Sequence, residues 1–234
     1  MLLFDWKEPA SWTPVVRAFR RRRATPGQLF EFVASHFDGF AVYHAARPLD
    51  VASYYRSGLQ ISDYAAMGAR ARQIFAPARH PDISGPALEA AIAAMSADID
   101  DHQLFVAIDD RGFLVDSGHY LIYGSEFLCG VAAHLTSARS RDFRQLLKQY
   151  GRPTLFRLAL EISRLSREVE EELGPYLLSE LRRVRRRSRP RTIDFTIALK
   201  AAIGPEHVLS HMHPVEIPDP LLAMKLYTFS DQAA

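Results

Sequence analysis

Short apolar runs and longer amphipathic stretches alternate along this chain and predict its strands and helices. Short runs of apolar residues that are bounded by turn residues are typical of buried strands. Such runs lie at residues 40–43, 104–108, 119–123, 154–160 and 193–197. A turn at residues 109–112 is expected to join the second and third strands, and Gly204-Pro205 precedes the last strands of the sheet.

The segments between these runs carry the spacing of helices. Apolar residues recur at helical spacing in residues 1–38, 61–101, 127–135 and 160–191. A loop rich in proline and glycine at residues 77–86 interrupts the second region, and Gly174-Pro175 is expected to break the last one.

Strands separated by helices predict an α+β domain. We expect a single domain over residues 1–234, with residues 1–38 as an N-terminal helical cap. Residues 39–220 would form the core, and residues 160–191 would extend from it as a helical arm.

Composition narrows the class of protein. With 234 residues, of which 48% are hydrophobic, the chain is able to bury a full core. Cys129 is the only cysteine, which fits a reducing cytoplasm, and no apolar window approaches the ~20 residues of a membrane span. The first nine residues lack the basic start of a secretion signal, so we expect a cytoplasmic protein. Glycine-rich nucleotide loops, Gly-x-Ser-x-Gly and Cys-x-x-Cys do not occur, which disfavours the common nucleotide-fold, hydrolase and redox classes.

The most informative segment covers residues 43–60. His44 follows a predicted buried strand, small residues such as Ala45 come next, and Arg47 precedes a proline. A short helix is expected to begin near Asp50 and to stop at Gly58. This segment resembles the NAD-gripping first motif of the diphtheria toxin and poly(ADP-ribose) polymerase type of ADP-ribosyltransferase, in which a strand ends in His-Gly-Thr or a close relative and a helix ending in Gly-Leu follows.

Two later segments are similar to the next motifs of that family. In the family a tyrosine stacks on the nicotinamide ring and a nearby hydroxyl helps to fix the site, which implies Tyr120 or Tyr123 and then Ser125. Residues three apart face opposite sides of a strand, so only one of the two tyrosines would face the cleft. Asp194 begins a segment that matches the strand of the catalytic glutamate, with one methylene less, and Glu126 is a second candidate acid.

The resemblance implies a split, strongly bent antiparallel sheet with helical insertions, and a cytoplasmic, bacterial enzyme that uses NAD as its substrate. His44 would hold a ribose, Ala45 would let the ligand approach the backbone, and Arg47 would contact the pyrophosphate. Asp194, assisted by Glu126, would stabilise positive charge on the anomeric carbon while nicotinamide leaves. The acceptor would be a protein, a nucleic acid or water.

Each candidate residue also has a structural interpretation. His44 is able to bond backbone carbonyls, the tyrosines to pack in the core, and Asp194 to cap a turn. Glu126 suits the first turn of a helix, where an acid complements the dipole.

A second feature is the run of seven arginines between residues 182 and 191. Such a run attracts phosphates, so a non-catalytic nucleic-acid-binding protein is the alternative function. The glutamates at residues 168–180 are also able to neutralise part of this positive charge, so that the segment is a solvated helical arm. The third interpretation is a structural or interaction protein whose long helix pairs with a partner. His207, His211 and His213 lack an acid or cysteine at a metal-binding spacing, so we expect no metal.

Overall fold

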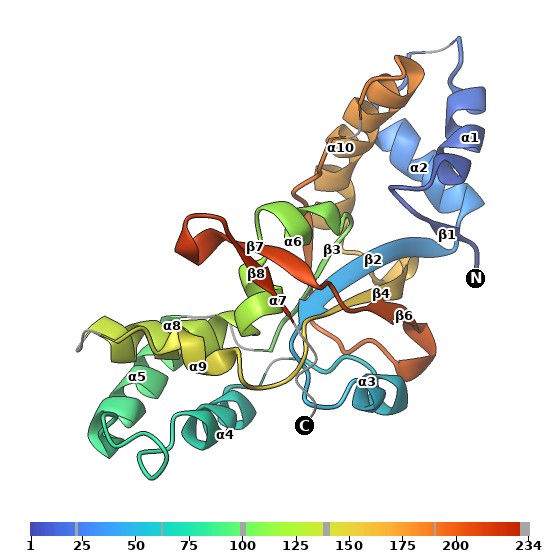
Figure 1. Cartoon of the computed structure of the whole chain (residues 1–234). Coiled ribbons are helices and arrows are strands. Elements are labelled where there is room, and N and C mark those ends of the chain that lie inside the picture. The colour runs from blue at the N-terminus through green and yellow to red at the C-terminus, as the bar shows by residue number, and fades with distance from the viewer. Residues whose placement is uncertain (22, 62, 99–101, 138–140, 190, 230–234) are drawn as a thin grey trace.

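An antiparallel sheet runs through the middle of the protein (Figure 1). The structure, a computed structural model, describes residues 1–21, 23–61, 63–98, 102–137, 141–189 and 191–229. Strands pair in the order β5-β3-β2-β4-β6, and β1 joins β2 in parallel. The strands are β1 Leu3–Phe4, β2 Gly39–Ala46, β3 Leu104–Ala107, β4 Thr154–Glu161, β5 Thr196–Leu199 and β6 Val208–Met212. The predicted α+β class is therefore confirmed, and four of the five predicted strands are present, although the last begins at Thr196 instead of residue 193.

The central pair of strands places His44. Strand β2 pairs with β4 over its whole length, from Gly39 opposite Glu161 to Ala46 opposite Thr154. Residues 39–43 of β2 are buried, as their apolar character predicts, and burial decreases toward the end of the strand. His44 therefore lies where the strand leaves the core.

Three helices cover one part of the sheet and share one hydrophobic core with it: α1 Pro9–Ala18, α2 Pro26–His36 and α10 Arg167–Arg185. The expected break of the long helix at Gly174-Pro175 is wrong, because α10 continues through Pro175. Leu173, Leu177 and Leu181 are buried four residues apart, so packing along one face stabilises the helix across the proline.

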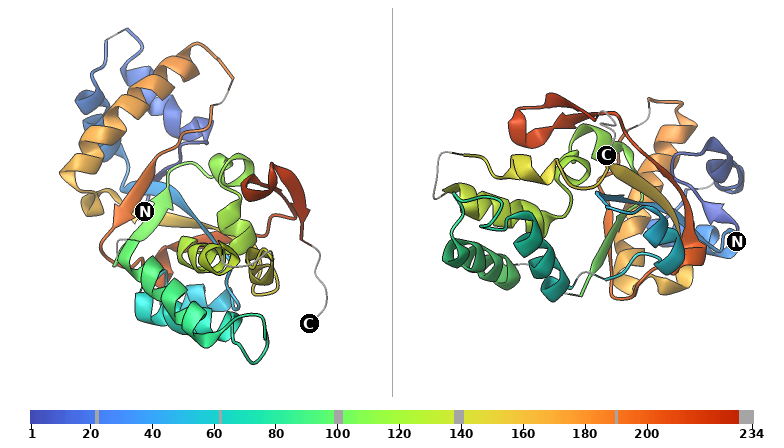
Figure 2. Two further views of the ribbon diagram at one scale, coloured as in Figure 1. Left: turned by 90° about the vertical axis from the view of Figure 1, so that its left-hand side faces the viewer. Right: turned by 60° about the horizontal axis from the view of Figure 1, so that its bottom comes forward.

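A second hydrophobic core lies at the other end of the molecule (Figures 1 and 2). It is built by α4 Tyr64–Ile74, α5 Gly85–Asp98, α7 His119–Tyr123, α8 Glu126–Ser137 and α9 Arg144–Leu147. The helices expected in residues 61–101 and 127–135 are confirmed. Within the described residues, no helix has both the length and the apolar character that crossing a membrane requires.

The prediction of a strand at residues 119–123 is wrong. The chain forms two short helices instead, α6 Arg111–Val115 and α7, so the turn at residues 109–112 does not join two strands. A short apolar run is compatible with either structure, and the consecutive buried residues Leu121, Ile122 and Tyr123 pack in the second core as a helical turn. Gly124, with φ of +89°, ends that turn.

The remaining elements are short. Helix α3 Ala52–Ser57 ends at Gly58, as expected, and φ there is +72°. A β-carbon at Gly58 would lie 2.0 Å from the Ile203 carbonyl oxygen, so both the backbone and the space require glycine. The other elements are the 3-10 turns Ile162–Arg164, Pro205–His207 and Pro220–Leu222, and the C-terminal hairpin of β7 Glu216–Asp219 and β8 Lys225–Thr228.

Candidate functional site

A pocket of about 840 Å³ opens where β2 leaves the core. Residues of β2, β3, α4, α7 and the start of α8 form its walls, and we call it the aromatic pocket because eight Tyr and Phe rings line it. Seven of the eight candidate residues from the sequence line it: His44, Ala45, Arg47, Tyr120, Tyr123, Ser125 and Glu126. Two segments about 75 residues apart therefore meet at one cavity.

His44 has the structural role predicted for it, a bond to a backbone carbonyl, and it also lines the pocket. Its Nδ1 lies 2.9 Å from the Phe105 carbonyl oxygen. Because a carbonyl oxygen only accepts, Nδ1 donates, and in the neutral ring Nε2 is an acceptor. Burial lowers the pKa of His44 from its usual 6.5, so the ring is neutral at pH 7. The ring thus holds β3 with one nitrogen and leaves the other as an acceptor.

Arg47 is held by the protein itself. It is 4% exposed, and its guanidinium donates to the carbonyls of Tyr150 at 2.8 Å, Leu121 at 3.3 Å and Lys148 at 2.5 Å. A fourth bond goes to the Tyr227 hydroxyl at 3.3 Å. Four of its five N–H groups are thereby used, and burial lowers its pKa. Arg47 therefore has almost no donor left for the predicted contact with a pyrophosphate. Its bonds instead organise the wall of the pocket.

Both tyrosines face the aromatic pocket, which corrects the expectation that only one would. They lie on helix α7, and residues three apart share one side of a helix. Tyr123 is buried and its hydroxyl donates to the carboxylate of Asp219. Tyr120 is only half-buried, and its hydroxyl lies 3.5 Å from Glu126 Oε2. Burial and this carboxylate raise the pKa of Tyr120 to about 12. Tyr120 therefore has the ring that a planar ligand is able to reach.

Glu126 is an exposed carboxylate of the pocket, and its one side-chain hydrogen bond among the described residues is the long contact with Tyr120. It lies in the first turn of α8, and the preceding Ser125 caps that helix by accepting from Leu128 N at 3.3 Å. The other acid of the pocket, Asp63, accepts from Ala65 N at 2.8 Å and so caps α4. The structural interpretation of Glu126, a place in the first turn of a helix, is confirmed, and its side chain also lines the pocket.

Arg70 is a pocket residue that the sequence interpretation missed. It lies on α4 and donates from Nη2 to the Arg47 carbonyl oxygen at 3.2 Å. Its Nε is buried and has no hydrogen-bond partner among the described residues. Arg70 lines the pocket together with Asp63, Met67 and Ile74, which lie on the same side of the helix at spacings of three and four residues. This spacing was the sequence signal that could have identified Arg70.

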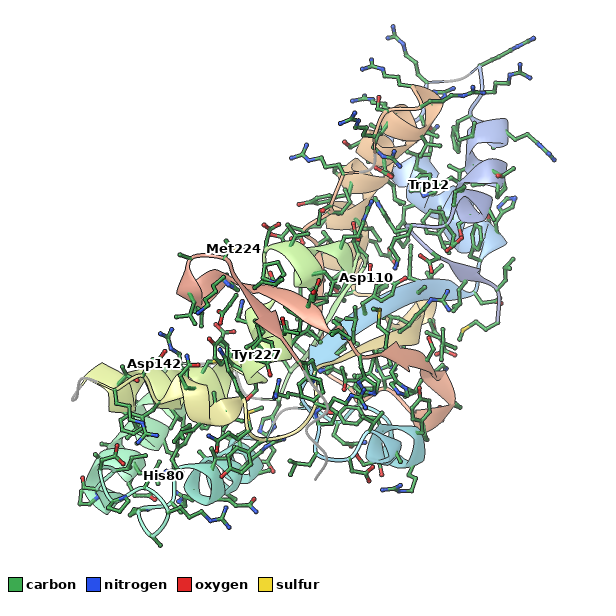
Figure 3. The ribbon with its side chains drawn as sticks, in the orientation of Figure 1. Trp12, His80, Asp110, Asp142, Met224 and Tyr227 are labelled. Carbon is green, nitrogen blue, oxygen red and sulfur yellow. The ribbon has the colours of Figure 1, made fainter. Side chains whose placement is uncertain are left out.

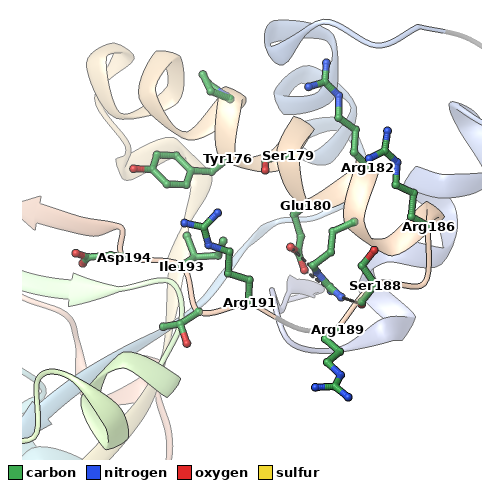
Figure 4. Close-up of a pocket in the computed structure, with 13 residues that line it drawn as sticks. Tyr176, Ser179, Glu180, Arg182, Arg186, Ser188, Arg189, Arg191, Ile193 and Asp194 are labelled. Carbon is green, nitrogen blue, oxygen red and sulfur yellow. Dashed lines mark hydrogen bonds and ion pairs between the residues drawn. The ribbon is translucent and has the colours of Figure 1, made fainter.

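Asp194 does not line the aromatic pocket, which corrects the expectation that it shares a cleft with His44. Ile193, Phe195 and Ile197 alternate inward, so Asp194 and Thr196 are exposed on the other side of the chain. Thr196 lines the aromatic pocket, whereas Asp194 lines a second pocket of about 710 Å³ (Figure 4). Asp194 and Thr196 are only two residues apart, so the two pockets are neighbours.

The second pocket is basic, and we call it the arginine pocket. It is lined by Arg182, Arg183, Arg186, Arg189 and Arg191, and by two carboxylates, Glu180 and Asp194.

No metal centre accompanies either pocket in the described ranges, where no three His, Cys, Asp or Glu residues lie close enough together to hold an ion. Comparison of the chain with known protein families, with curated proteins and with solved structures finds no match. Inferences about function therefore depend on the two pockets and their chemistry.

Proposed function

We propose that the aromatic pocket binds NAD and that the protein is an NAD-dependent ADP-ribosyltransferase in which Glu126 is the reacting acid. The observation that carries this proposal is the meeting of residues 44–47 with residues 120–126 around one cavity. These are two of the three segments that resemble the motifs of the transferase family. The volume of about 840 Å³ and the aromatic lining with a few polar groups are typical of sites for ligands of this size.

The polar groups of the pocket suit the parts of NAD. Nε2 of His44, as an acceptor, suits a ribose hydroxyl, and the partly exposed ring of Tyr120 suits stacking on nicotinamide. Arg70, which lines the pocket beside Arg47, suits a pyrophosphate oxygen, a role for which the guanidinium of Arg47 has almost no free donor.

In the proposed reaction, the bond between the anomeric carbon and the nicotinamide nitrogen breaks, and its electron pair stays on nicotinamide. The carboxylate of Glu126 orients the ribose 2′-hydroxyl and stabilises the positive charge that develops on the ribose. The acceptor then gives an electron pair to the anomeric carbon and loses its proton to solvent.

Release of nicotinamide from NAD tests this proposal. We expect release by the wild-type protein, and a rate lower by roughly 10² or more in Glu126→Gln, because one preorganised charge is lost while the volume is kept. Glu31→Gln, at an exposed position of α2, is the matched control and should behave as wild type. No release by the wild type would contradict the transferase reaction, and a loss in Asp194→Asn with none in Glu126→Gln would assign the acid to Asp194.

A further inference from the structure

The arginine pocket gathers one sign of charge in a concave surface. Five arginines line it, on the last turns of α10 and on the segment that follows (Figure 4). Asp194 lies at the end of the pocket opposite Arg182 and Arg186. Positive charge in a cleft with protein walls produces a stronger field than the same charge on a flat surface.

Only one of these guanidinium groups is neutralised inside the pocket. Glu180, which is 2% exposed, accepts from Arg183 Nε at 2.7 Å, and Arg183 also donates to the Ser188 carbonyl oxygen at 2.7 Å. Arg182, Arg186 and Arg189 are exposed and form no ion pair with any described residue. Their donors are therefore free for an external anion. The predicted neutralisation of the arm by its glutamates applies to Arg183 and does not extend to these three.

A second basic run reaches the same end of the molecule. Arg185 donates to the carbonyl oxygen of Phe19, the residue that follows α1 as its C-cap. The arginines at positions 20, 21 and 23 follow directly, so two runs that are about 160 residues apart in sequence lie side by side. Nitrogen-tipped side chains extend from this end of the molecule in Figure 3.

An aromatic ring accompanies the charges. Tyr176 lines the arginine pocket, is 37% exposed, and is supported edge-on by Phe195 at 5.0 Å between ring centroids. The paired N–H groups of a guanidinium match two oxygens of a phosphate, and bases stack on exposed aromatic rings.

We propose that the arginine pocket binds single-stranded nucleic acid, with backbone phosphates on Arg182, Arg186 and Arg189 and a base on Tyr176. This binding does not depend on the proposed use of NAD.

Fluorescence anisotropy with a labelled DNA or RNA strand of about 20 nucleotides tests the proposal. We expect wild-type affinity to fall with salt, with a slope of log K against log salt of about −2 or steeper, because three phosphates each contribute about −0.7. The triple variant Arg182→Ser, Arg186→Ser, Arg189→Ser should bind at least about tenfold more weakly at 0.1 M salt and show a flatter slope.

Matched variants distinguish binding at the arginine pocket from nonspecific attraction by the protein's overall positive charge. Arg56→Ser, Arg72→Ser and Arg141→Ser together remove the same charge from exposed positions elsewhere, and should change affinity less than about twofold. Replacing the three pocket arginines with lysine should keep the salt slope. Tyr176→Leu should weaken binding by about fivefold or more.

Several results would overturn the proposal. These are no binding by the wild type, a slope near zero, equal losses in the two triple-serine variants, or tighter binding of the duplex than of the single strand. Preferential binding of phosphatidylserine vesicles would assign the pocket to a membrane surface instead. Because the wild-type slope needs no variant, the test holds even where a substitution prevents folding.

Discussion

The two pockets differ in how their charged groups are held. In the aromatic pocket the charged groups are mostly engaged with the protein: Arg47 with three backbone carbonyls and Asp63 with a helix N-terminus. In the arginine pocket four of the five guanidinium groups, all except that of Arg183, have no ion partner in the described chain. The walls of the aromatic pocket are therefore preorganised by the protein's own hydrogen bonds, whereas most charges of the arginine pocket are open to an external ligand.

This difference predicts different responses to substitution. The wall of the aromatic pocket depends on a shared hydrogen-bond network, and removing one residue of such a network disrupts several bonds at once. Single substitutions there should therefore have large effects on stability. Exposed charges act nearly independently and contribute little to stability, so the arginine pocket should respond to the number of charges and to salt.

The largest effect on stability is expected from Arg47→Met. The change leaves the carbonyls of Tyr150, Leu121 and Lys148 without the guanidinium that joins them. We expect the free energy of unfolding, measured in urea, to fall by about 3 kcal/mol. Arg186→Met, in the arginine pocket, should leave it unchanged within error; equal values for the two variants would contradict the contrast between the pockets.

A smaller effect is expected at Gly124, which joins α7 to α8. Its φ of +89° strains any residue with a β-carbon, so Gly124→Ala should lower the free energy of unfolding by about 1–2 kcal/mol. The control is Gly27→Ala in α2, where a β-carbon would have nothing within 4 Å. Because alanine favours a helix, this control should be as stable as wild type or slightly more stable. A Gly124→Ala protein with wild-type stability would mean that the turn is not constrained.

The smallest effect concerns pH and His44. Burial lowers the pKa of His44 in the folded protein below its usual 6.5, so the unfolded chain binds more protons between the two pKa values. The contribution of His44 to stability is complete above pH 6.5 and is lost as pH falls from there through the folded-state pKa. Urea unfolding across this range should therefore depend less on pH in His44→Asn, which keeps a donor for the Phe105 carbonyl. An unchanged pH dependence would show that His44 is not buried as described.

Local patterns predicted much of the fold. The strand that carries His44 near its end and the helix stop at Gly58 were predictable because each is specified by neighbouring residues. The apolar run at residues 119–123 was not, since a five-residue run does not distinguish a strand from a buried helical turn. That error also led to the wrong assignment of faces for Tyr120 and Tyr123.

The composition of the site depended on contacts that the sequence does not reveal. Arg47 was predicted near the ligand, but its carbonyl partners lie 74 to 103 residues away along the chain. The two arginine runs are brought together by the hydrogen bond from Arg185 to Phe19. The pocket that Asp194 lines is set by the path of the chain before β5. Such arrangements are set by tertiary packing.

Calorimetric titration with NAD tests the central claim most directly. We predict one NAD bound per chain, with affinity at least about tenfold lower in Tyr120→Leu, which removes the ring that we propose stacks on nicotinamide. The triple-serine variant of Arg182, Arg186 and Arg189 should keep wild-type affinity, because these residues line the other pocket. Absence of binding to the wild-type protein, or a loss in the triple-serine variant with none in Tyr120→Leu, would contradict the assignment of NAD to the aromatic pocket.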